Sequence, residues 1–127
     1  MIELREAGFP VEVIDGVPVV VTPSEVDIAN ADGFRTGLLH AAAHGSAVIV
    51  VDMTQTAFCD SAGVHAILGA YKRAEAEGAE IRLAVTAPAV RRILAITAID
   101  RLLPIYATVA EALAPLQPPA SAPVTPA

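Results

Sequence analysis

Hydrophobic and polar residues follow one another in short blocks that predict alternating strands and helices. In FPVEVIDGVPVVVTP (9–23), valines stand on both sides of Asp15–Gly16, a pair that favours a two-residue turn between two strands. AVIVVD (47–52) is continuously apolar up to Asp52, which is typical of a strand covered on both faces. EIRLAV (80–85) alternates like a strand, and LLPIYA (102–107) is a weaker last one. The pattern therefore predicts an initial β-hairpin and three further strands.

Between these strands, apolar residues recur at helical spacing. Helices are predicted over 30–44 and 61–77, each followed by a glycine, then from Pro88 onward, and finally over 108–116, where a T-x-x-E capping box begins the helix. The residues expected to face the core are Ala31, Phe34, Leu38, Ala41 and Ala42 in the first helix, Val64, Ile67, Leu68, Tyr71 and Ala74 in the second, and Val90, Ile93, Leu94 and Thr97 in the third.

The resulting order, ββαβαβαβα, predicts the α/β class: a mixed sheet of four to five strands, parallel in its middle, with helices packed against it. One domain is expected over residues 10–114, after an N-terminal segment over 1–9. From Pro115 onward, five of 13 residues are proline and the others are mostly small or polar, so residues 115–127 are predicted to be disordered.

Composition narrows the range of partners. The chain has 127 residues, 54% of them hydrophobic and 17% charged, which suffices for one packed core. Its net charge of −6 argues against nucleic acid or an anionic membrane as the main partner. No secretory signal is visible, and the uncharged stretch 36–51 is interrupted by His40, His44, Gly45 and Ser46, so it favours helix, turn and strand over a membrane span. We expect a cytoplasmic monomer or weak dimer.

The stretch AFCDSAGVHAIL (57–68) carries most of the candidate chemistry. Cys59 would need a lowered pKa and a nearby histidine to act as a nucleophile, and no histidine here belongs to a recognisable signature, so a packing role is favoured. His40 and His44 are four apart, a workable ligand spacing, but they lack an acidic or cysteine cluster beside them. With His65 they are expected to be solvated or half-buried.

Asp52 ends the central strand, where a response-regulator receiver has its phosphate acceptor. A receiver also needs an acidic pair after the first strand and a lysine after a later one. The only lysine, Lys72, lies in the middle of a predicted helix, so the receiver hypothesis fails. The chain also has no glycine-rich phosphate loop. No enzymatic activity, metal or cofactor is therefore expected.

Asp60–Ser61 allows two interpretations. Either residue suits the N-cap of the 61–77 helix, a role worth about 1 kcal/mol. A hydroxyl at a helix N-terminus is also accessible, and a phosphate added there brings roughly two negative charges that the helix end tolerates. A partner docked over this position would be repelled, with Asp60 and Asp27 adding to the repulsion. A cap alone and a reversible switch both remain open from the residues.

The sequence resembles the STAS domain, in particular the anti-sigma factor antagonists. The resemblance covers about residues 10–114 and rests on four pieces in the right order: VIVVDMTQTAFCDSAG, VHAILGAYKRAEAEG, EIRLAVTAPAVRRIL and AIDRLLPIYATVAEAL. It implies that Ser61, the first serine of an Asp-Ser-x-Gly motif, is phosphorylated. The implied partner is an anti-sigma factor that is also a serine kinase, and a phosphatase restores the binding.

The resemblance also implies a contact surface for that partner. Asp27 in SEVD corresponds to the family's aspartate after the hairpin, although Pro and Ser stand nearby where a glycine is common. Ala62 replaces a second serine and leaves Ser61 as the single acceptor in the motif. The residues expected to bind the partner are Asp27, Thr54, Thr56, Asp60, Ser61, Ala62 and Gly63. The alternative is a STAS scaffold, or a sensor of a small ligand such as a nucleotide or lipid, whose serine is never phosphorylated.

Overall fold

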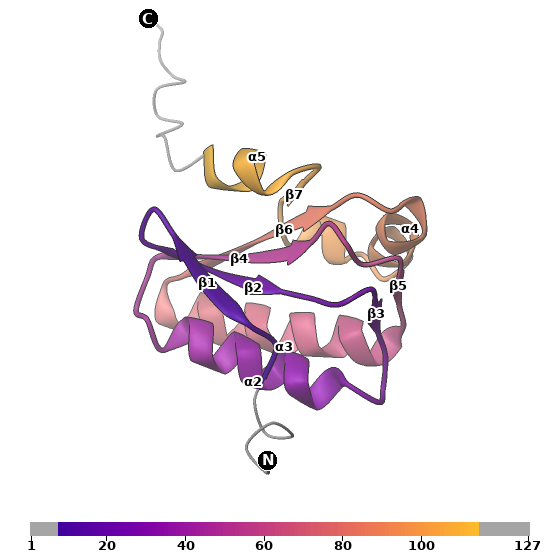
Figure 1. The fold of residues 1–127 in the computed structure, drawn as a ribbon, viewed down its shortest axis with the longest axis horizontal. Coiled ribbons are helices and arrows are strands. Elements are labelled where there is room, and N and C mark those ends of the chain that lie inside the picture. The colour runs from indigo at the N-terminus through magenta and orange to yellow at the C-terminus, as the bar shows by residue number, and fades with distance from the viewer. Residues whose placement is uncertain (1–7, 115–127) are drawn as a thin grey trace, which may run out of the picture.

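The computed structural model describes residues 8–114 (Figure 1). The predicted tail over 115–127 lies outside the described residues, as does the predicted N-terminal segment up to residue 7. Between them, strands and helices alternate as the sequence predicts, and the α/β class is confirmed.

A five-stranded mixed sheet forms the centre of the fold, in the order β1-β2-β4-β6-β7. β1 and β2 form the antiparallel hairpin, and the other neighbours pair in parallel. The hairpin turns at Asp15 and Gly16, whose φ angles of 52° and 81° are the positive values that its two-residue turn requires. The strands are β1 (Val11–Ile14), β2 (Val17–Val21), β4 (Val48–Met53), β6 (Glu80–Val85) and β7 (Ile105–Tyr106).

Helices cover both faces of this sheet (Figure 1). α2 and α3 lie side by side on one face, and α5 crosses the other. In β4, Val48 and Val50 pack in the cluster that contains Ala112 of α5, while Ile49 and Val51 belong to the main core. This arrangement explains why β4 is apolar at four successive positions, 48–51, before Asp52. The helices are α2 (Ala31–Ala42), α3 (Ser61–Glu77), α4 (Pro88–Ile96), the 3-10 helix η1 (Ile99–Arg101) and α5 (Val109–Leu113).

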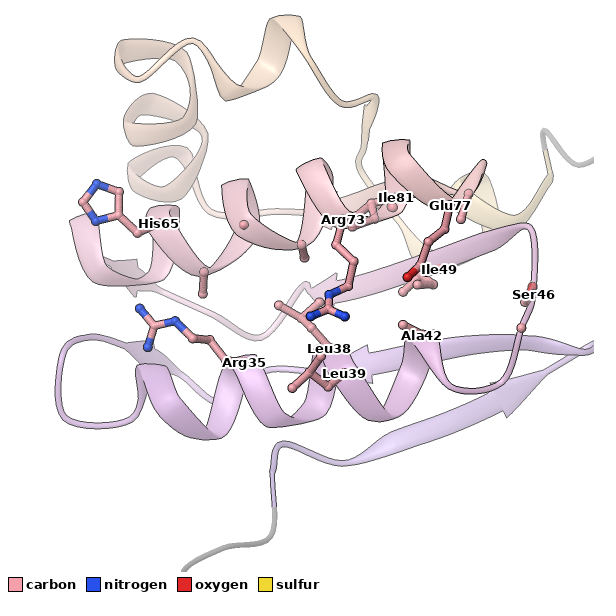
Figure 2. A pocket seen from close by; sticks show the side chains of 16 residues that line it. Arg35, Leu38, Leu39, Ala42, Ser46, Ile49, His65, Arg73, Glu77 and Ile81 are labelled. Atoms are coloured by element: carbon pink, nitrogen blue, oxygen red, sulfur yellow. The ribbon is translucent and has the colours of Figure 1, made fainter.

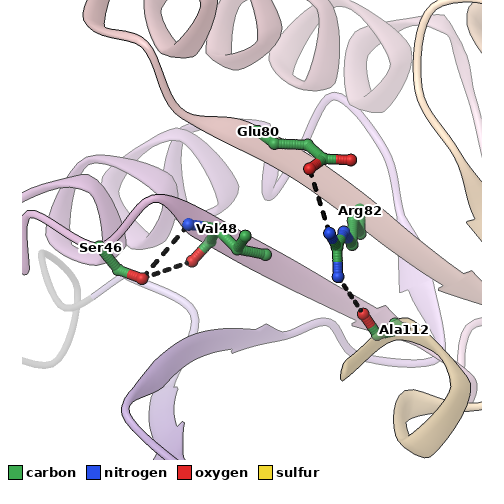
Figure 3. Close-up of polar contacts among 5 residues, drawn as sticks. All are labelled: Ser46, Val48, Glu80, Arg82 and Ala112. Atoms are coloured by element: carbon green, nitrogen blue, oxygen red, sulfur yellow. Dashed lines mark hydrogen bonds and ion pairs between the residues drawn. The ribbon is translucent and has the colours of Figure 1, made fainter. Parts of the chain in front are cut away.

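Arg82 of β6 fastens the short helix α5 to the sheet (Figure 3). Its side chain is buried, Nη1 donates a hydrogen bond to the Ala112 carbonyl oxygen at 3.0 Å, and Nη2 donates to Glu80 Oε1 at 3.1 Å. A guanidinium group can make such bonds in two directions because its donors are fixed in one plane. Just before the central strand β4, the Ser46 hydroxyl donates to the Val48 carbonyl oxygen and accepts from the Val48 N–H.

Two features differ from the expectation. Residues 24–30 and 54–61, expected as loops, contain the short strands β3 (Glu25–Val26) and β5 (Phe58–Cys59), which pair in parallel as a second sheet. Thr97, predicted to face the core, is exposed, and its hydroxyl donates to the Ile93 carbonyl oxygen at 2.7 Å where α4 ends. A threonine hydroxyl can satisfy a free carbonyl at a helix end in this way, so burial is not needed.

Candidate functional site

Asp60 is the N-cap of α3 and also holds a second segment. Its Oδ1 accepts hydrogen bonds from the backbone N–H groups of Ala62 at 2.8 Å and Gly63 at 3.4 Å. Its Oδ2 accepts from the backbone N–H of Ile28 at 3.3 Å. The capping interpretation of this aspartate is therefore confirmed, and the carboxylate additionally joins the segment after β3 to the start of α3.

Ser61 is the first residue of α3 and is exposed. Within residues 8–114 its hydroxyl group makes no hydrogen bond, so a group could be added to this oxygen without breaking one. The backbone N–H groups of Ala62 and Gly63 at this helix end are already bonded to Asp60. A group added to Ser61 would thus meet a carboxylate beside it and a partly satisfied helix end.

Asp27 lies in a well-bonded turn beside this helix start. Its backbone N–H donates to Asn30 Oδ1 at 2.9 Å, and its own Oδ1 accepts from the Ala29 N–H at 2.9 Å. Asn30 Nδ2 closes the turn on the Glu25 carbonyl oxygen at 2.8 Å. The pairing of β3 with β5 places this turn next to Asp60. The structure therefore brings together Asp27 and the Asp60–Ser61 pair, as the sequence analysis expected.

The two loop threonines differ from each other. Thr54 is half-buried, and its N–H and hydroxyl both donate to Asp52 Oδ1, at 3.0 and 2.6 Å. Thr56 is only 1% exposed; its hydroxyl is bonded to that of Thr22 and donates to the Pro23 carbonyl oxygen at 2.7 Å. This burial corrects the prediction that the Thr56 side chain contacts a partner. Thr56 fixes the path of the loop instead.

Gly63 also has a packing role in place of the predicted contact role. It is buried, and a Cβ atom added there would lie 2.6 Å from Cys59 Sγ and 2.7 Å from Val26 Cγ1. Both neighbours belong to the small β3–β5 sheet. The absence of a side chain at Gly63 lets the first turn of α3 rest directly on that sheet. Ala62, between Gly63 and Ser61, is half-buried.

Cys59 is poorly suited to nucleophilic chemistry. Its side chain is buried, and this burial, reinforced by the negative charge of Asp60, raises the pKa of the thiol to about 11. A reactive cysteine needs the opposite shift. His40, His44 and His65 are all exposed, and no group of three or more His, Cys, Asp or Glu side chains between residues 8 and 114 is arranged to hold a metal ion.

Two exposed apolar residues beside Ser61 were missed by sequence reasoning. Ile28 is 81% exposed, and its backbone is bonded to Asp60; Phe58 is 50% exposed and precedes Asp60 by two residues. The available signal was that each is the largest apolar residue in a short stretch with no helical or strand periodicity. We define the contact face as Asp27, Ile28, Phe58, Asp60 and Ser61. It combines apolar side chains with two carboxylates and one free hydroxyl, a composition suited to a protein partner.

Comparison with known proteins gives the family of this fold. The model of the STAS domain matches residues 9–112, and the chain belongs to the STAS domain family. The family and fold that the sequence resembles are thus confirmed. No curated protein sequence matches the chain significantly. In the part of the chain that the structure describes, no helix is long and apolar enough to cross a membrane.

Solved structures that share this fold belong to proteins of different kinds. An anti-sigma factor antagonist from Mycobacterium paratuberculosis is 28% identical, with a TM-score of 0.76 over 83% of this chain and 89% of that one. The phosphorylated form of the Bacillus cell fate determinant SpoIIAA is 23% identical, with a TM-score of 0.66 over 87% of this chain and 100% of that one. The murine anion transporter Slc26a9 is 17% identical, with a TM-score of 0.67 over 89% of this chain and 23% of that one.

Proposed function

We propose that this protein is an anti-sigma factor antagonist controlled by phosphorylation of Ser61. Unphosphorylated, it binds an anti-sigma factor with serine-kinase activity through the contact face and so regulates sigma-factor-dependent transcription. Phosphorylation by that partner ends the binding, and a phosphatase restores it. The protein itself acts by binding in the cytoplasm and catalyses no reaction. The observation that carries the proposal is that Ser61, next to Asp60 in the contact face, is exposed and that its hydroxyl makes no hydrogen bond within residues 8–114.

The proposed mechanism is a change of charge at an interface. A phosphoryl group adds about 1.5 to 2 negative charges near pH 7. At Ser61 it would stand next to the Asp60 carboxylate, which already uses the nearest N–H groups, and beside the apolar side chains of Ile28 and Phe58. Docking would then require this charge to lose its water. A loss of about 1.4 kcal/mol of binding free energy weakens binding tenfold, so a loss of a few kcal/mol suffices for a switch.

The fold should survive the modification. The Ser61 side chain is exposed and lies at the positive end of a 17-residue helix, which tolerates an anion. Support from relatives is consistent with this mechanism: the Mycobacterium paratuberculosis protein is an anti-sigma factor antagonist, and SpoIIAA exists in a phosphorylated form. Neither relative identifies the partner of this chain, which a pull-down from the native host would supply.

Intact-mass measurement after incubation with the cognate kinase and ATP tests the acceptor. The wild-type protein should gain one phosphate and the Ser61→Ala variant none. Binding to the kinase then tests the switch, because Ser61→Ala should bind at least as tightly as wild type, while Ser61→Asp should bind more than tenfold more weakly. Ala76→Asp is the matched control, since it adds the same charge at an exposed position near the far end of α3.

Two results would overturn the proposal. One is phosphorylation of the Ser61→Ala variant at an undiminished rate, which would place the acceptor elsewhere. The other is equal affinity of the Ser61→Ala and Ser61→Asp variants for the kinase. A loss of binding in Ala76→Asp as large as in Ser61→Asp would show that overall charge, and not the contact face, controls the interaction.

A further inference from the structure

A groove runs between α2 and α3 (Figure 2). Its volume is about 340 Å³, within the range of small-molecule sites. Ile49 of β4 and Ile81 of β6 form its floor, and Leu38 and Ala70 are among the residues of its two helical walls. On α3 the groove extends from His65 to Glu77, which the rise of a helix places about 18 Å apart. The groove is thus long, narrow and apolar at its base.

The space exists because α3 carries small residues where it faces α2. Gly69 lines the groove in the middle of the helix, and a Cβ atom added there would meet no other atom within 4 Å. Glycine is unfavourable in a helix interior, and here no turn or close contact requires it. Ala66 and Ala70 on α3 and Ala42 on α2 extend the same open space. The groove is therefore unfilled volume between two helices that otherwise pack closely.

Positive side chains from both helices reach into this groove. Figure 2 shows Arg73 of α3 pointing into the gap and Arg35 of α2 near the end where His65 lies, while Glu77 points in nearer the opposite end. Arg35 is paired with the exposed Asp32 at 2.8 Å, and Arg73 has no ion pair with any residue between 8 and 114. The whole chain has a net charge of −6 and only eight Lys and Arg residues. The two arginines at this groove thus form a locally positive region in a chain whose net charge is negative.

We propose that the groove binds a small amphipathic carboxylate. Its aliphatic or aromatic body would lie beside Leu39 and Gly69, over the buried floor residues, and its carboxylate would reach the guanidinium group of Arg73. Arg35, nearer the His65 end, would add positive charge farther along the groove. Glu77 sets the direction, because it repels the carboxylate from its own end of the groove. Apolar burial supplies affinity and the arginines supply selectivity for the anion. The groove shares no residue with the contact face, although His65 at one end lies one helical turn after Ser61, and the proposal does not rest on phosphorylation of Ser61.

Decanoate is a suitable probe, with decanol as the uncharged control of the same length. Titration of the full-length protein, followed by amide NMR and calorimetry, should give a dissociation constant below about 1 mM for decanoate. The amide signals that shift should include those of Leu38, Gly69 and Ala70. Decanol should bind at least tenfold more weakly, because it cannot pair with the arginines. Equal affinity for the two probes would overturn the proposed anion selectivity.

Three variants test the location of the site. Gly69→Leu fills the groove and should abolish decanoate binding, while its thermal unfolding, at or above the wild-type midpoint, shows that it folds. Arg73→Gln should weaken decanoate binding about tenfold without affecting decanol. Lys72→Gln removes a neighbouring exposed charge outside the groove and should change nothing. Decanoate binding that persists in Gly69→Leu, or that is weakened as much by Lys72→Gln as by Arg73→Gln, would refute the site.

Discussion

Two glycines on the same helix should respond to alanine in opposite directions. Gly63 and Gly69 both lie in α3, within two turns of each other. A Cβ atom at Gly63 would lie 2.6 Å from Cys59 Sγ and 2.7 Å from Val26 Cγ1, whereas at Gly69 it would meet nothing within 4 Å. The same substitution therefore separates the intrinsic preference of the helix from the packing of its first turn on the β3–β5 sheet.

The magnitudes follow from these distances. Alanine is more favourable than glycine in a helix interior by about 1 kcal/mol, so Gly69→Ala should stabilise the protein by about 0.5 to 1 kcal/mol. At Gly63, overpacking of a buried contact costs about 1 to 3 kcal/mol, and helix preference offsets only part of it in the first turn. Gly63→Ala should therefore destabilise the protein by about 1 to 2 kcal/mol.

Urea unfolding of both variants measures the difference, provided that the slope of the transition stays constant. Adding Cys59→Ala to Gly63→Ala removes the sulfur atom nearest to the new Cβ. The loss of unfolding free energy in the double variant should therefore be smaller than the sum of the losses in the two single variants. A Gly63→Ala variant as stable as wild type, or a destabilised Gly69→Ala variant, would refute this account of the helix start.

Two further predictions concern buried groups. Burial raises the pKa of the Cys59 thiol from 9.0 to about 11. The contribution of the neutral thiol to the free energy of unfolding should therefore be fully present below pH 9 and fall by about 2 to 3 kcal/mol as the pH rises to 11. Unfolding measured at several pH values should show a smaller decrease in the Cys59→Ala variant. Arg82→Ala should release α5, because the bond to the Ala112 carbonyl oxygen is lost; faster amide exchange limited to α5 would confirm this, and unchanged exchange would contradict it.

Elements with a strong local pattern could be predicted from the sequence. The helix predicted over 61–77 is observed as Ser61–Glu77, because its apolar stripe, its N-cap and its final glycine all indicate the same limits. The hairpin is fixed by Asp15–Gly16, whose turn geometry few other pairs adopt. The stretch over 47–52, apolar up to Asp52, indicated a central strand, since a strand covered on both faces needs no alternating polar positions.

The small β3–β5 sheet could not be predicted, and several details of the site depend on it. Each strand has two residues, too few for any periodicity, and the paired residues Val26 and Cys59 are far apart in the chain. Without this pairing, the burial of Thr56 and the close contact at Gly63 had no signal in the sequence, and the family resemblance alone led to the expectation that both residues contact a partner. The exposure of Ile28 and Phe58 was missed for the same reason.

The two oxygens of Asp60 perform separate tasks, and one substitution can divide them. Oδ1 caps α3 through Ala62 and Gly63, and Oδ2 holds the Ile28 N–H. An asparagine has one acceptor oxygen and caps a helix about as well as aspartate, so Asp60→Asn should keep the cap and lose the bond to Ile28. We expect the free energy of unfolding to change by less than about 1 kcal/mol, while amide exchange over residues 27–30 accelerates.

Asp60→Ala, the matched control, should lose the cap as well and be less stable. If the proposed partner needs the Ile28 segment in place, Asp60→Asn should also weaken binding before any phosphorylation; unchanged exchange over 27–30 would show that this carboxylate does not hold the contact face together.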